Sequence, residues 1–426
     1  MTMTEQPKCP YTSFDPWAPQ VLSEPHEFWK ALRKDAPVYE IPFPSIPDPV
    51  FLISRKEDLE YVCKHPELFS NYPHTGFIRW GELDEELEAL FREKGGFKVI
   101  NAIATDDPPD HTIDRKLVNS VLTVPKVERM SGWMQEIIDE LIGAFPVTGE
   151  VEFMTDFAIP FPLRVIATIL GFEIWETEKF VEFTEAFTTF VDPGKPRQEV
   201  LDSAETFIEA QKYLMAKIES FRTSPKDVLL SDIANARLEN GELMAADKVL
   251  SIAFLVLGAG NETTRNGIGS TIYLLARRPD LWEKLKETPA LLPRVVEESL
   301  RTNAPATITT RTVRVDTEMD GVVLPKGAVV VMLWGSGSRD EGSFPNAGEI
   351  DLERSNFRGH TTFGHGIHFC VGNALARKEI TLTVQALLNT FERIELAVPE
   401  SEVRYQPSLA FRALESLPLR LIRKSK

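Results

Sequence analysis

The stretch FGHGIHFCVG, residues 363–372, is the most informative ten residues of the chain. It holds Cys370, one of only 3 cysteines in the sequence, together with two histidines and three glycines. A cysteine thiolate can attack an electrophile, bind zinc or ligate haem iron, and each chemistry needs different neighbours. The residues around Cys370 therefore indicate which of these three chemistries the thiolate can support.

Three readings of Cys370 need no haem. A zinc site would recruit His360, His365 and His368, but their spacing fits poorly with common zinc-finger and ribbon patterns. A nucleophile would need a positioned base, and His368, two residues away, would point sideways on an extended loop. A buried, inert cysteine is the third reading, because free cysteine often behaves as a small apolar core residue.

A haem reading explains more of the string than these three. Gly364, Gly366 and Gly372 would let the backbone lie close to a flat macrocycle. Phe363 would shield the sulfur from water, and backbone N–H groups past the turn would hydrogen-bond the thiolate. The ten residues favour haem and leave the other readings open.

Composition limits the possible partners and surroundings. The chain has 426 residues, 64 acidic against 47 basic side chains and a formal charge of -17, which opposes binding to a phosphate backbone. The longest apolar stretch, 252–260, is far shorter than the roughly 20 residues that cross a bilayer. The cysteines are few and scattered, which suits a reducing compartment. We expect a cytoplasmic protein with no membrane anchor and no nucleic-acid partner.

Hydrophobic periodicity predicts a mainly helical α+β chain forming a single domain over 1–426. Short strands with hairpin turns at Asp320-Gly321 and at 325–327 are expected after residue 305. Ser54 is the expected N-cap of a helix over KEDLEYVCKHP. The further expected elements are a strand at 50–53, an acidic helix within 80–96, a helix near Asp110, helices over 124–290 broken at 160–162, 191–197 and 239–242, a long helix starting near Leu243, and a helix then a strand after Cys370.

The segment 363–372 resembles the haem-binding signature F-x-x-G-x-[RH]-x-C-x-G of the cytochrome P450 family. The resemblance implies a helix-rich part, a smaller β-rich part, and haem b between a long central helix and the cysteine loop. Cys370 would then be the axial iron ligand. The other cofactor-binding positions implied in this loop are Phe363, Gly364, Gly366, His368 and Gly372.

The second mark is LVLGAGNETTRNGIG, 255–269, inside the expected long helix. A glycine in a helix interior costs about 1 kcal/mol relative to alanine, so its four glycines need a reason. Close approach of a flat ligand and a helix-packing groove both remain open. The stretch resembles the family's A-G-x-[DE]-T motif, which implies that Ala259 and Gly260 lie at the cofactor. Thr263 would hydrogen-bond dioxygen, and Glu262 would help deliver protons.

Further marks follow in the family's order. Glu298 and Arg301, with Arg354, resemble its buried E-x-x-R network, which supports structure and not chemistry. His111 and Arg115 lie four residues apart and share a helix face. By the resemblance, these two, Arg311 and His368 would contact the haem propionates.

The implied reaction inserts one oxygen atom from O2 into a hydrophobic small molecule such as a terpenoid, steroid, fatty acid or aromatic. The sequence carries no flavin or nicotinamide fingerprint and no iron–sulfur cysteine set, so a separate ferredoxin and ferredoxin reductase are expected, with the enzyme a monomer. The alternatives are a peroxygenase, a nitric-oxide reducer or a non-catalytic haem protein, and the Glu262–Thr263 pair counts against the first. Residues that would line a substrate pocket, or equally a plain core, are Phe77, Ile78, Trp80, Phe97, Val99, Ile100, Phe187, Phe190, Leu255, Val256, Ile308 and 409–411.

Overall fold

The structure, a computed structural model, describes residues 16–42, 48–71, 81–97, 102–146, 149–173, 177–191 and 197–424. The chain forms two compact units. The first consists of residues 1–70, 127–161 and 262–426, and the second of residues 71–126 and 162–261. Helices dominate and strands form a smaller part, as expected. The single domain over 1–426 stays a prediction.

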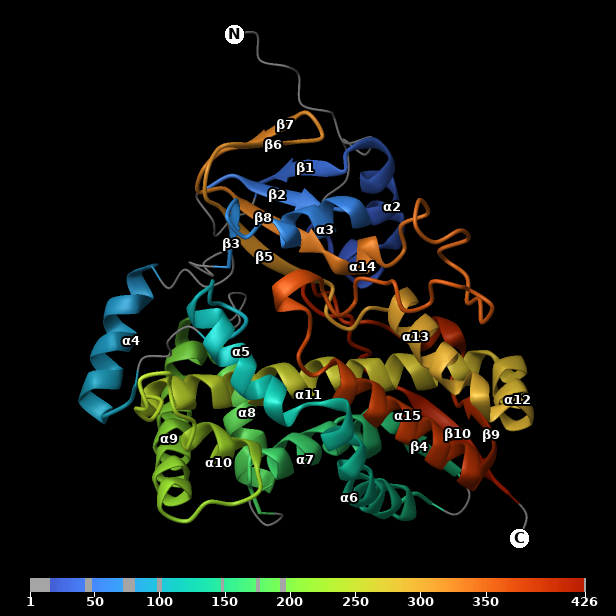
Figure 1. Ribbon diagram of the computed structural model, residues 1–426. Coiled ribbons are helices and arrows are strands. Elements are labelled where there is room, and N and C mark those ends of the chain that lie inside the picture. The colour runs from blue at the N-terminus through green and yellow to red at the C-terminus, as the bar shows by residue number, and fades with distance from the viewer. Residues whose placement is uncertain are drawn as a thin grey trace. The chain divides into compact units, whose positions relative to one another are not determined.

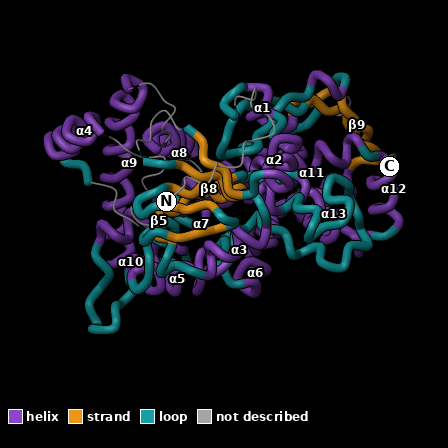
Figure 2. The backbone as a smooth tube through the Cα atoms, turned by 90° about the horizontal axis from the view of Figure 1, so that it is seen from above, coloured by secondary structure: helices purple, strands orange, loops and turns teal. Residues whose placement is uncertain are grey.

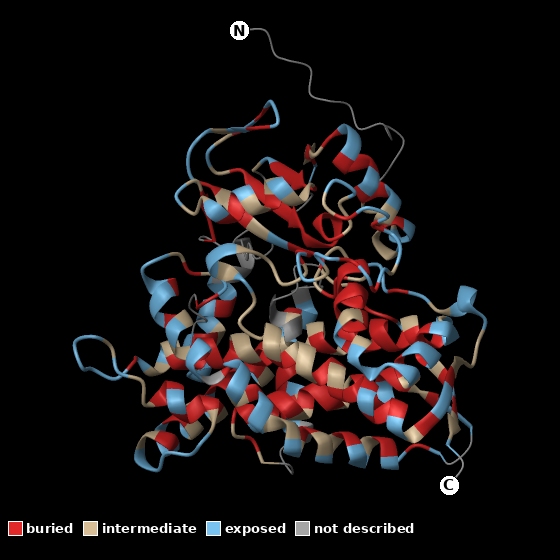
Figure 3. Ribbon diagram, turned by 45° about the vertical axis from the view of Figure 1, so that its right-hand side comes forward, coloured by how far each residue is buried: buried red, intermediate tan, exposed pale blue. Residues whose placement is uncertain are grey.

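A five-stranded sheet organises one part of the first unit (Figure 1). Its order is β1 (Val38–Ile41), β2 (Val50–Ile53), β8 (Val329–Leu333), β5 (Ile308–Val313) and β3 (Phe69–Ser70). β2 and β8 pair in parallel, and the other neighbours are antiparallel. Every residue of β2 and β8 is buried, as the red strands of Figure 3 show, which explains their unbroken apolar sequences.

Helix α3 (Lys56–Lys64) packs on this sheet through Leu59 and Val62, and the expectation that Ser54 caps it is wrong. The N-cap is Arg55, and the Ser54 hydroxyl instead donates to the carbonyl of Pro37. A distant carboxylate, Asp340, accepts the hydrogen bond of the Lys56 N–H at 2.8 Å. Tertiary contacts thus replace the local cap. The other helices around the sheet are α1 (Pro19–Ser23), α2 (His26–Asp35) and α14 (Trp334–Gly337).

One of the two expected hairpin turns is confirmed. Asp320 and Gly321, at φ +49° and +73°, join β6 (Thr317–Met319) to β7 (Val322–Leu324), and two consecutive left-handed residues are what a type I′ turn needs. The turn at 325–327 is not a hairpin, because β7 pairs only with β6 while β8 lies in the five-stranded sheet. Turn residues show that the chain reverses, but not which strands pair.

The rest of the first unit is a helical layer with a second, three-stranded sheet. That sheet has the antiparallel order β4 (Gly149–Glu152), β10 (Pro418–Arg423) and β9 (Phe391–Leu396). Helix α15 (Asn373–Thr390) follows Cys370 and packs on α13 (Leu292–Thr302) and on β9, confirming the expected helix and strand. The remaining helices are α6 (Val124–Gly143, whose first turn belongs to the second unit), the π-helix η1 (Met154–Ala158), α12 (Pro279–Glu287), and the 3-10 helices η3 (Pro289–Leu291), η4 (Gly366–His368) and η5 (Glu400–Glu402).

The second unit is helical in its described part. Helix α9 (Arg197–Thr223) packs against α8 (Thr177–Val191), α10 (Leu229–Ala234) and α4 (Gly81–Lys94), and Figures 1 and 2 both place α8 beside it. The helix break expected at 160–162 lies one residue earlier, because η1 ends at Ala158 and Pro160 begins α7 (Pro160–Ile169), where a missing N–H costs nothing. Helix α5 (Asp110–Val121) also belongs to this unit and lies where the sequence predicts a helix near Asp110.

Helix α11 (Ala246–Arg277) belongs to both units, with the change at Glu262. It begins three residues later than expected, because Leu243 forms a β-bridge with Arg237. Its glycines pack against side chains. A Cβ on Gly260 would lie 2.5 Å from Ile166, and one on Gly269 would lie 2.6 Å from the sulfur of Met154. For these positions the helix-packing explanation of the glycines is confirmed.

Candidate functional site

The Cys370 loop is fixed through its backbone. The Cys370 N–H donates to the Phe363 carbonyl at 2.8 Å, and the Cys370 carbonyl accepts a 2.7 Å hydrogen bond from the Asn373 side-chain amide. Gly364 and Gly366 adopt φ +72° and +69°, which side chains other than hydrogen rarely allow. A Cβ on Gly366 would also lie 2.8 Å from the Cys63 carbonyl oxygen on α3. The loop therefore holds one conformation against α3.

Cys370 is half-buried and forms no disulfide, and the adjacent residues Phe369 and Val371 are apolar. Phe369 and Ile367 expose 36% and 40% of their surface, although large apolar residues are usually covered. A Cβ on Gly372 would be 3.9 Å from the sulfur, so the glycine leaves space there. A soft thiolate among apolar side chains fits a flat iron macrocycle.

The structure does not support the zinc reading. His360 is buried, and its Nε2 lies 2.8 Å from Glu297 Oε2, not at a shared site with Cys370. Across the described ranges, no three histidine, cysteine, aspartate or glutamate side chains gather in a way that could hold a metal ion. The fully buried cysteine is Cys63 on α3, whereas Cys370 is only half-buried.

Arg311 lies on β5 and is 8% exposed. Its guanidinium donates to the Thr310 carbonyl at 2.6 Å and lies 3.5 Å from the Thr309 hydroxyl. A cation this deep in a protein is usually matched with an anion. Its placement suits a carboxylate ligand such as a haem propionate, and that role stays a prediction, as does the one for His368 on η4.

Helix α11 carries a less buried stripe. Leu255, Val256, Ala259, Glu262 and Thr263 are half-buried or exposed, while most of the helix is buried. Their spacing of one, three and four residues puts them on one helical face. Glu262 and Thr263, the residues expected to deliver protons and to bind dioxygen, therefore lie on the same partly exposed face of α11 as Ala259.

Glu262 has partners that the sequence reasoning missed. Arg265 Nη2 lies 2.6 Å from Glu262 Oε2, and the Asn266 amide donates to Oε1 at 3.2 Å. These residues follow at i+3 and i+4, the spacing of helical side-chain pairs, so periodicity could have found them. The carboxylate is held along the axis of α11.

In the second unit, His111 and Arg115 lie on α5 as expected. His111 is buried, and Arg115 is half-buried with its Nε donating to Asn119 Oδ1 at 3.1 Å. Their contact with a cofactor stays a prediction, as do those of Ala259 and Gly260.

The buried E-x-x-R network is confirmed. Glu298 accepts hydrogen bonds from Arg301 at 2.7 and 2.9 Å and from Arg354 at 3.1 Å, and all three side chains are buried. Arg301 also donates to the carbonyls of Ala347 and Glu349. The network ties α13 to the segment that leads into the cysteine loop, which is a structural role.

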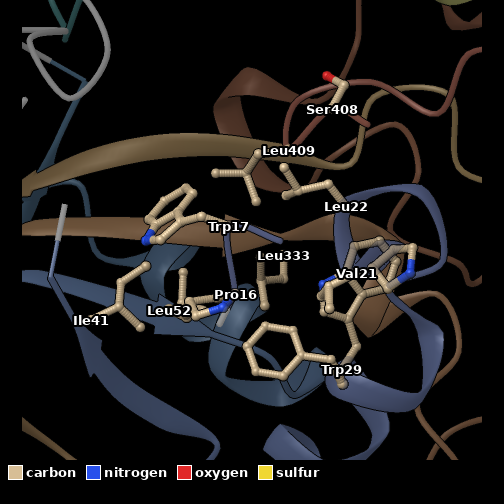
Figure 4. Close-up of a pocket in the computed structure, with 12 residues that line it drawn as sticks. Pro16, Trp17, Val21, Leu22, Trp29, Ile41, Leu52, Leu333, Ser408 and Leu409 are labelled. Atoms are coloured by element: carbon tan, nitrogen blue, oxygen red, sulfur yellow. The ribbon is translucent and has the colours of Figure 1, made fainter. Parts of the chain in front are cut away.

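Only some of the residues expected to line a substrate pocket lie in the described part of the chain. Phe97 binds Gln211 through its backbone, and Leu409 lines a small apolar pocket of the first unit with Trp17, Trp29 and Leu333 (Figure 4). That pocket contains no titratable side chain and carries no chemistry. Lying outside the described residues are Phe77, Ile78, Trp80, Val99 and Ile100, as are the side chains of Phe187 and Phe190.

The cysteine loop and the acid and hydroxyl residues on a long helix fit the class of haem-thiolate oxidoreductases that the resemblance implies. Comparison with known proteins agrees. The family model for cytochrome P450 matches residues 77–288 and 290–410, and the chain belongs to this family. It is a P450 monooxygenase whose cofactor is haem b.

Three similar proteins illustrate this family relationship. Cytochrome P450 107B1 of Saccharopolyspora erythraea is 34% identical over 87% of this chain and 89% of its own. Vitamin D(3) 25-hydroxylase of Pseudonocardia autotrophica is 31% identical over 93% of each. The structure of PksS, a P450 of the Bacillus subtilis bacillaene polyketide synthase, superposes with TM-score 0.85 at 29% identity, covering 96% of this chain and 100% of that one. In the described ranges, no helix is long and apolar enough to cross a membrane.

Proposed function

We propose that the chain hydroxylates a large, mainly apolar small molecule, with Cys370 as the thiolate ligand of haem iron. The observation that carries this assignment is the Cys370 loop, in which the Cys370 N–H and carbonyl are both hydrogen-bonded while Cys370 and the adjacent Phe369 stay partly exposed. Phe363, Gly364, Gly366, His368 and Gly372 would shape the ligand side. As the family resemblance implies, Arg311, His368, His111 and Arg115 would bind the haem propionates.

Haem with a thiolate ligand supplies the activation of dioxygen and the insertion of one oxygen atom into an unactivated bond. The protein's own part is positioning and proton supply. Glu262 is held at i+3 and i+4 by Arg265 and Asn266, and Thr263 is the next residue on the same helix. In this proposal the carboxylate relays protons from solvent, and the Thr263 Oγ1 passes them on and hydrogen-bonds the oxygen being activated.

A steroid is the substrate class that we place first. Among the relatives, one is named a steroid C26-monooxygenase, from Mycobacterium tuberculosis and 30% identical over 79% of this chain, and another a vitamin D(3) 25-hydroxylase. A solved P450 structure, 27% identical, is a complex with an acyl carrier protein ligated to hexadec-9Z-enoic acid, so a fatty acid is the alternative class. The less buried residues Leu255 and Val256 on α11 offer the apolar contacts that such a molecule needs. A spin-shift titration with steroids, terpenoids, fatty acids and aromatics ranks the classes; tighter binding of fatty acids than of any steroid would contradict this choice.

Electrons would come from a separate ferredoxin and its reductase, because the sequence carries no flavin or nicotinamide fingerprint. A peroxygenase would need no such donor. Turnover that depends on ferredoxin and reductase supports the proposal, whereas equal turnover with hydrogen peroxide alone would favour the peroxygenase.

The first test is the difference spectrum of the reduced protein with carbon monoxide. A strongly red-shifted Soret band is the signature of a thiolate ligand, and it should vanish in Cys370→His while haem is still bound. The matched control is Cys63→Ser, which removes the thiol on α3 and should keep the band. A red-shifted band in Cys370→His would refute Cys370 as the ligand.

The second test concerns Thr263. Replacing it with alanine removes the hydroxyl but little volume, so we expect NADH consumption to continue while product falls about tenfold or more and peroxide accumulates, since a lost proton-transfer group typically costs 10²–10⁴ in rate. Thr264→Ala, the next residue but buried, is the control and should stay coupled. Full coupling of electrons to product in Thr263→Ala would remove Thr263 from the mechanism.

A further inference from the structure

Glu297 is a buried carboxylate that takes no part in the network of Glu298, Arg301 and Arg354. It precedes Glu298 on α13, its side chain is 2% exposed, and its partners come from both sides of the cysteine loop. His360 Nε2 lies 2.8 Å from its Oε2, while Arg377 Nε and Nη2 lie 2.6 and 3.1 Å from its two oxygens. A buried charge is costly unless it is paired this completely.

The charge states of this cluster are set by burial and hydrogen bonding. Burial lowers the pKa of His360, so at neutral pH the ring is neutral and acts as a hydrogen-bond partner. Burial alone would raise the pKa of Glu297, but the hydrogen bonds from His360 and Arg377 outweigh it and hold that pKa below its ordinary value. The ion pair is therefore Glu297 with Arg377. A further cation, the 66% exposed Arg358, lies 3.6 Å from Glu297, and the charges of Arg377 and the buried Arg301 act on His360.

Arg377 connects the ion pair to the cysteine loop through two contacts. Its guanidinium lies over the Phe363 ring, 4.2 Å from the centroid, which is a favourable cation–π distance. Its Nη1 donates to the Asn373 side-chain oxygen at 2.7 Å. One planar group thus fixes both an aromatic ring before the cysteine and an amide after it.

Phe363 and Asn373 are the two residues that hold the peptide groups of Cys370. The Phe363 carbonyl accepts the Cys370 N–H at 2.8 Å, and the Asn373 amide donates to the Cys370 carbonyl at 2.7 Å. Arg377 thus contacts the side chains of both residues that bind the cysteine backbone, and Arg377 is itself paired with Glu297. The chain of contacts lies entirely within the first unit.

We propose that Glu297 is a positioning residue for Cys370, which acts through Arg377 and sets the orientation and electron donation of the thiolate. The inference rests on the proposed role of Cys370 as iron ligand. Hydrogen bonds around a metal ligand tune its basicity and the reduction potential of the metal. Without the charge of Glu297, the 22% exposed Arg377 side chain can turn to solvent, and the hold on Cys370 loosens on both sides.

The test compares Glu297→Gln and Arg377→Lys with the control Lys378→Gln. The control removes the neighbouring cation on α15, whose partner is the 59% exposed Glu128. The readouts are the ferric–ferrous reduction potential of the holoenzyme and the rate at which the red-shifted carbon monoxide band is lost on mild warming. We expect both test variants to shift the potential and to lose the band several-fold faster than the wild type, with Lys378→Gln unchanged. The double variant should add little to either single change, because both break one pair.

Equal potentials and equal band stability in Glu297→Gln and wild type would overturn the inference. If Glu297→Gln does not fold, Arg377→Lys decides, since it keeps a cation beside Glu297 but removes the planar group that contacts both Phe363 and Asn373: a shifted potential supports the chain of contacts, and an unchanged one refutes it. A wild type without the red-shifted band would instead refute the proposed function itself, so the two failures are distinguishable.

Discussion

At the scale of single residues, Gly366 is the position where the cysteine loop tolerates least change. Its φ of +69° and the 2.8 Å approach of a Cβ to the Cys63 carbonyl act together. We expect Gly366→Ala to lower the free energy of unfolding by about 1–3 kcal/mol and to weaken haem retention. Urea unfolding and haem content measure the two effects.

A matched glycine should respond with the opposite sign. Gly132 lies in the exposed face of α6, has an ordinary φ, and a Cβ added there would meet no other atom within 4 Å. Gly132→Ala should therefore stabilise the fold by up to about 1 kcal/mol. Equal effects of the two substitutions would show that conformation at Gly366 is unimportant.

Sequence separation decides which residue contacts can be predicted. Glu298 and Arg301 are three apart on one helix, and the sequence predicts the pair together with Arg354. Glu297, the adjacent residue, gives no signal because its partners His360 and Arg377 are 63 and 80 residues away. Local periodicity indicates near pairs such as Glu298 and Arg301, whereas the distant partner Arg354, 56 residues from Glu298, is predicted only by the family resemblance.

At the scale of elements, the acidic end of α3 is a point of electrostatic strain. Burial, together with the nearby charges of Asp320 and Glu57, raises the pKa of Asp58 to about 7. Because the folded-state pKa lies above the ordinary value of 3.8, the charged carboxylate destabilises the fold increasingly as pH rises from there to about 7, and fully above it.

Asp58→Asn removes this penalty. We expect the variant to be more stable than the wild type at about pH 8, with a smaller gain at about pH 5.5, in chemical denaturation at both values. Glu353→Gln, an exposed acid outside this cluster, should change stability little at either pH. A gain that is the same at both pH values would mean that the charge of Asp58 is not the cause.

Elements with strong local patterns can be predicted, and those fixed by tertiary pairing cannot. The strand at β2, the helix α4 and the long α11 follow from apolar runs and 3.6-residue periodicity. β4, with the sequence GEVE, has no strand pattern and forms because β10 pairs with it. The turn at 325–327 is recognisable in the sequence, but its strands pair elsewhere. Pairing partners depend on the assembled sheet.

At the scale of the whole molecule, the order of the motifs predicts more than periodicity does. The sequence carries the cysteine loop, the acid–hydroxyl helix and the buried E-x-x-R in one order along the chain, and that order, not composition, indicates the fold. Composition cannot indicate the two compact units, because each is assembled from distant segments. The first unit, for example, joins residues 1–70 to 262–426.

The net charge of -17 makes an electrostatic prediction for electron delivery. A negatively charged ferredoxin would be repelled by most of this surface, so basic side chains next to the cysteine loop should guide it. Arg358, 66% exposed, precedes the loop, and Lys64, 57% exposed, ends the helix α3 on which the loop packs. Exposed charges more than about 10 Å apart are screened at 0.1 M salt, so guidance of this kind should weaken as salt rises.

We therefore expect Arg358→Gln to slow the first electron transfer from reduced ferredoxin several-fold at low ionic strength and to have little effect at high ionic strength, in stopped-flow measurements. Arg420→Gln is the matched control, because Arg420 is 54% exposed but lies on β10 of the three-stranded sheet, paired with Glu150. It should leave the rate unchanged. If the two variants slow transfer equally, only the total charge matters. If neither does, the donor approaches a different surface.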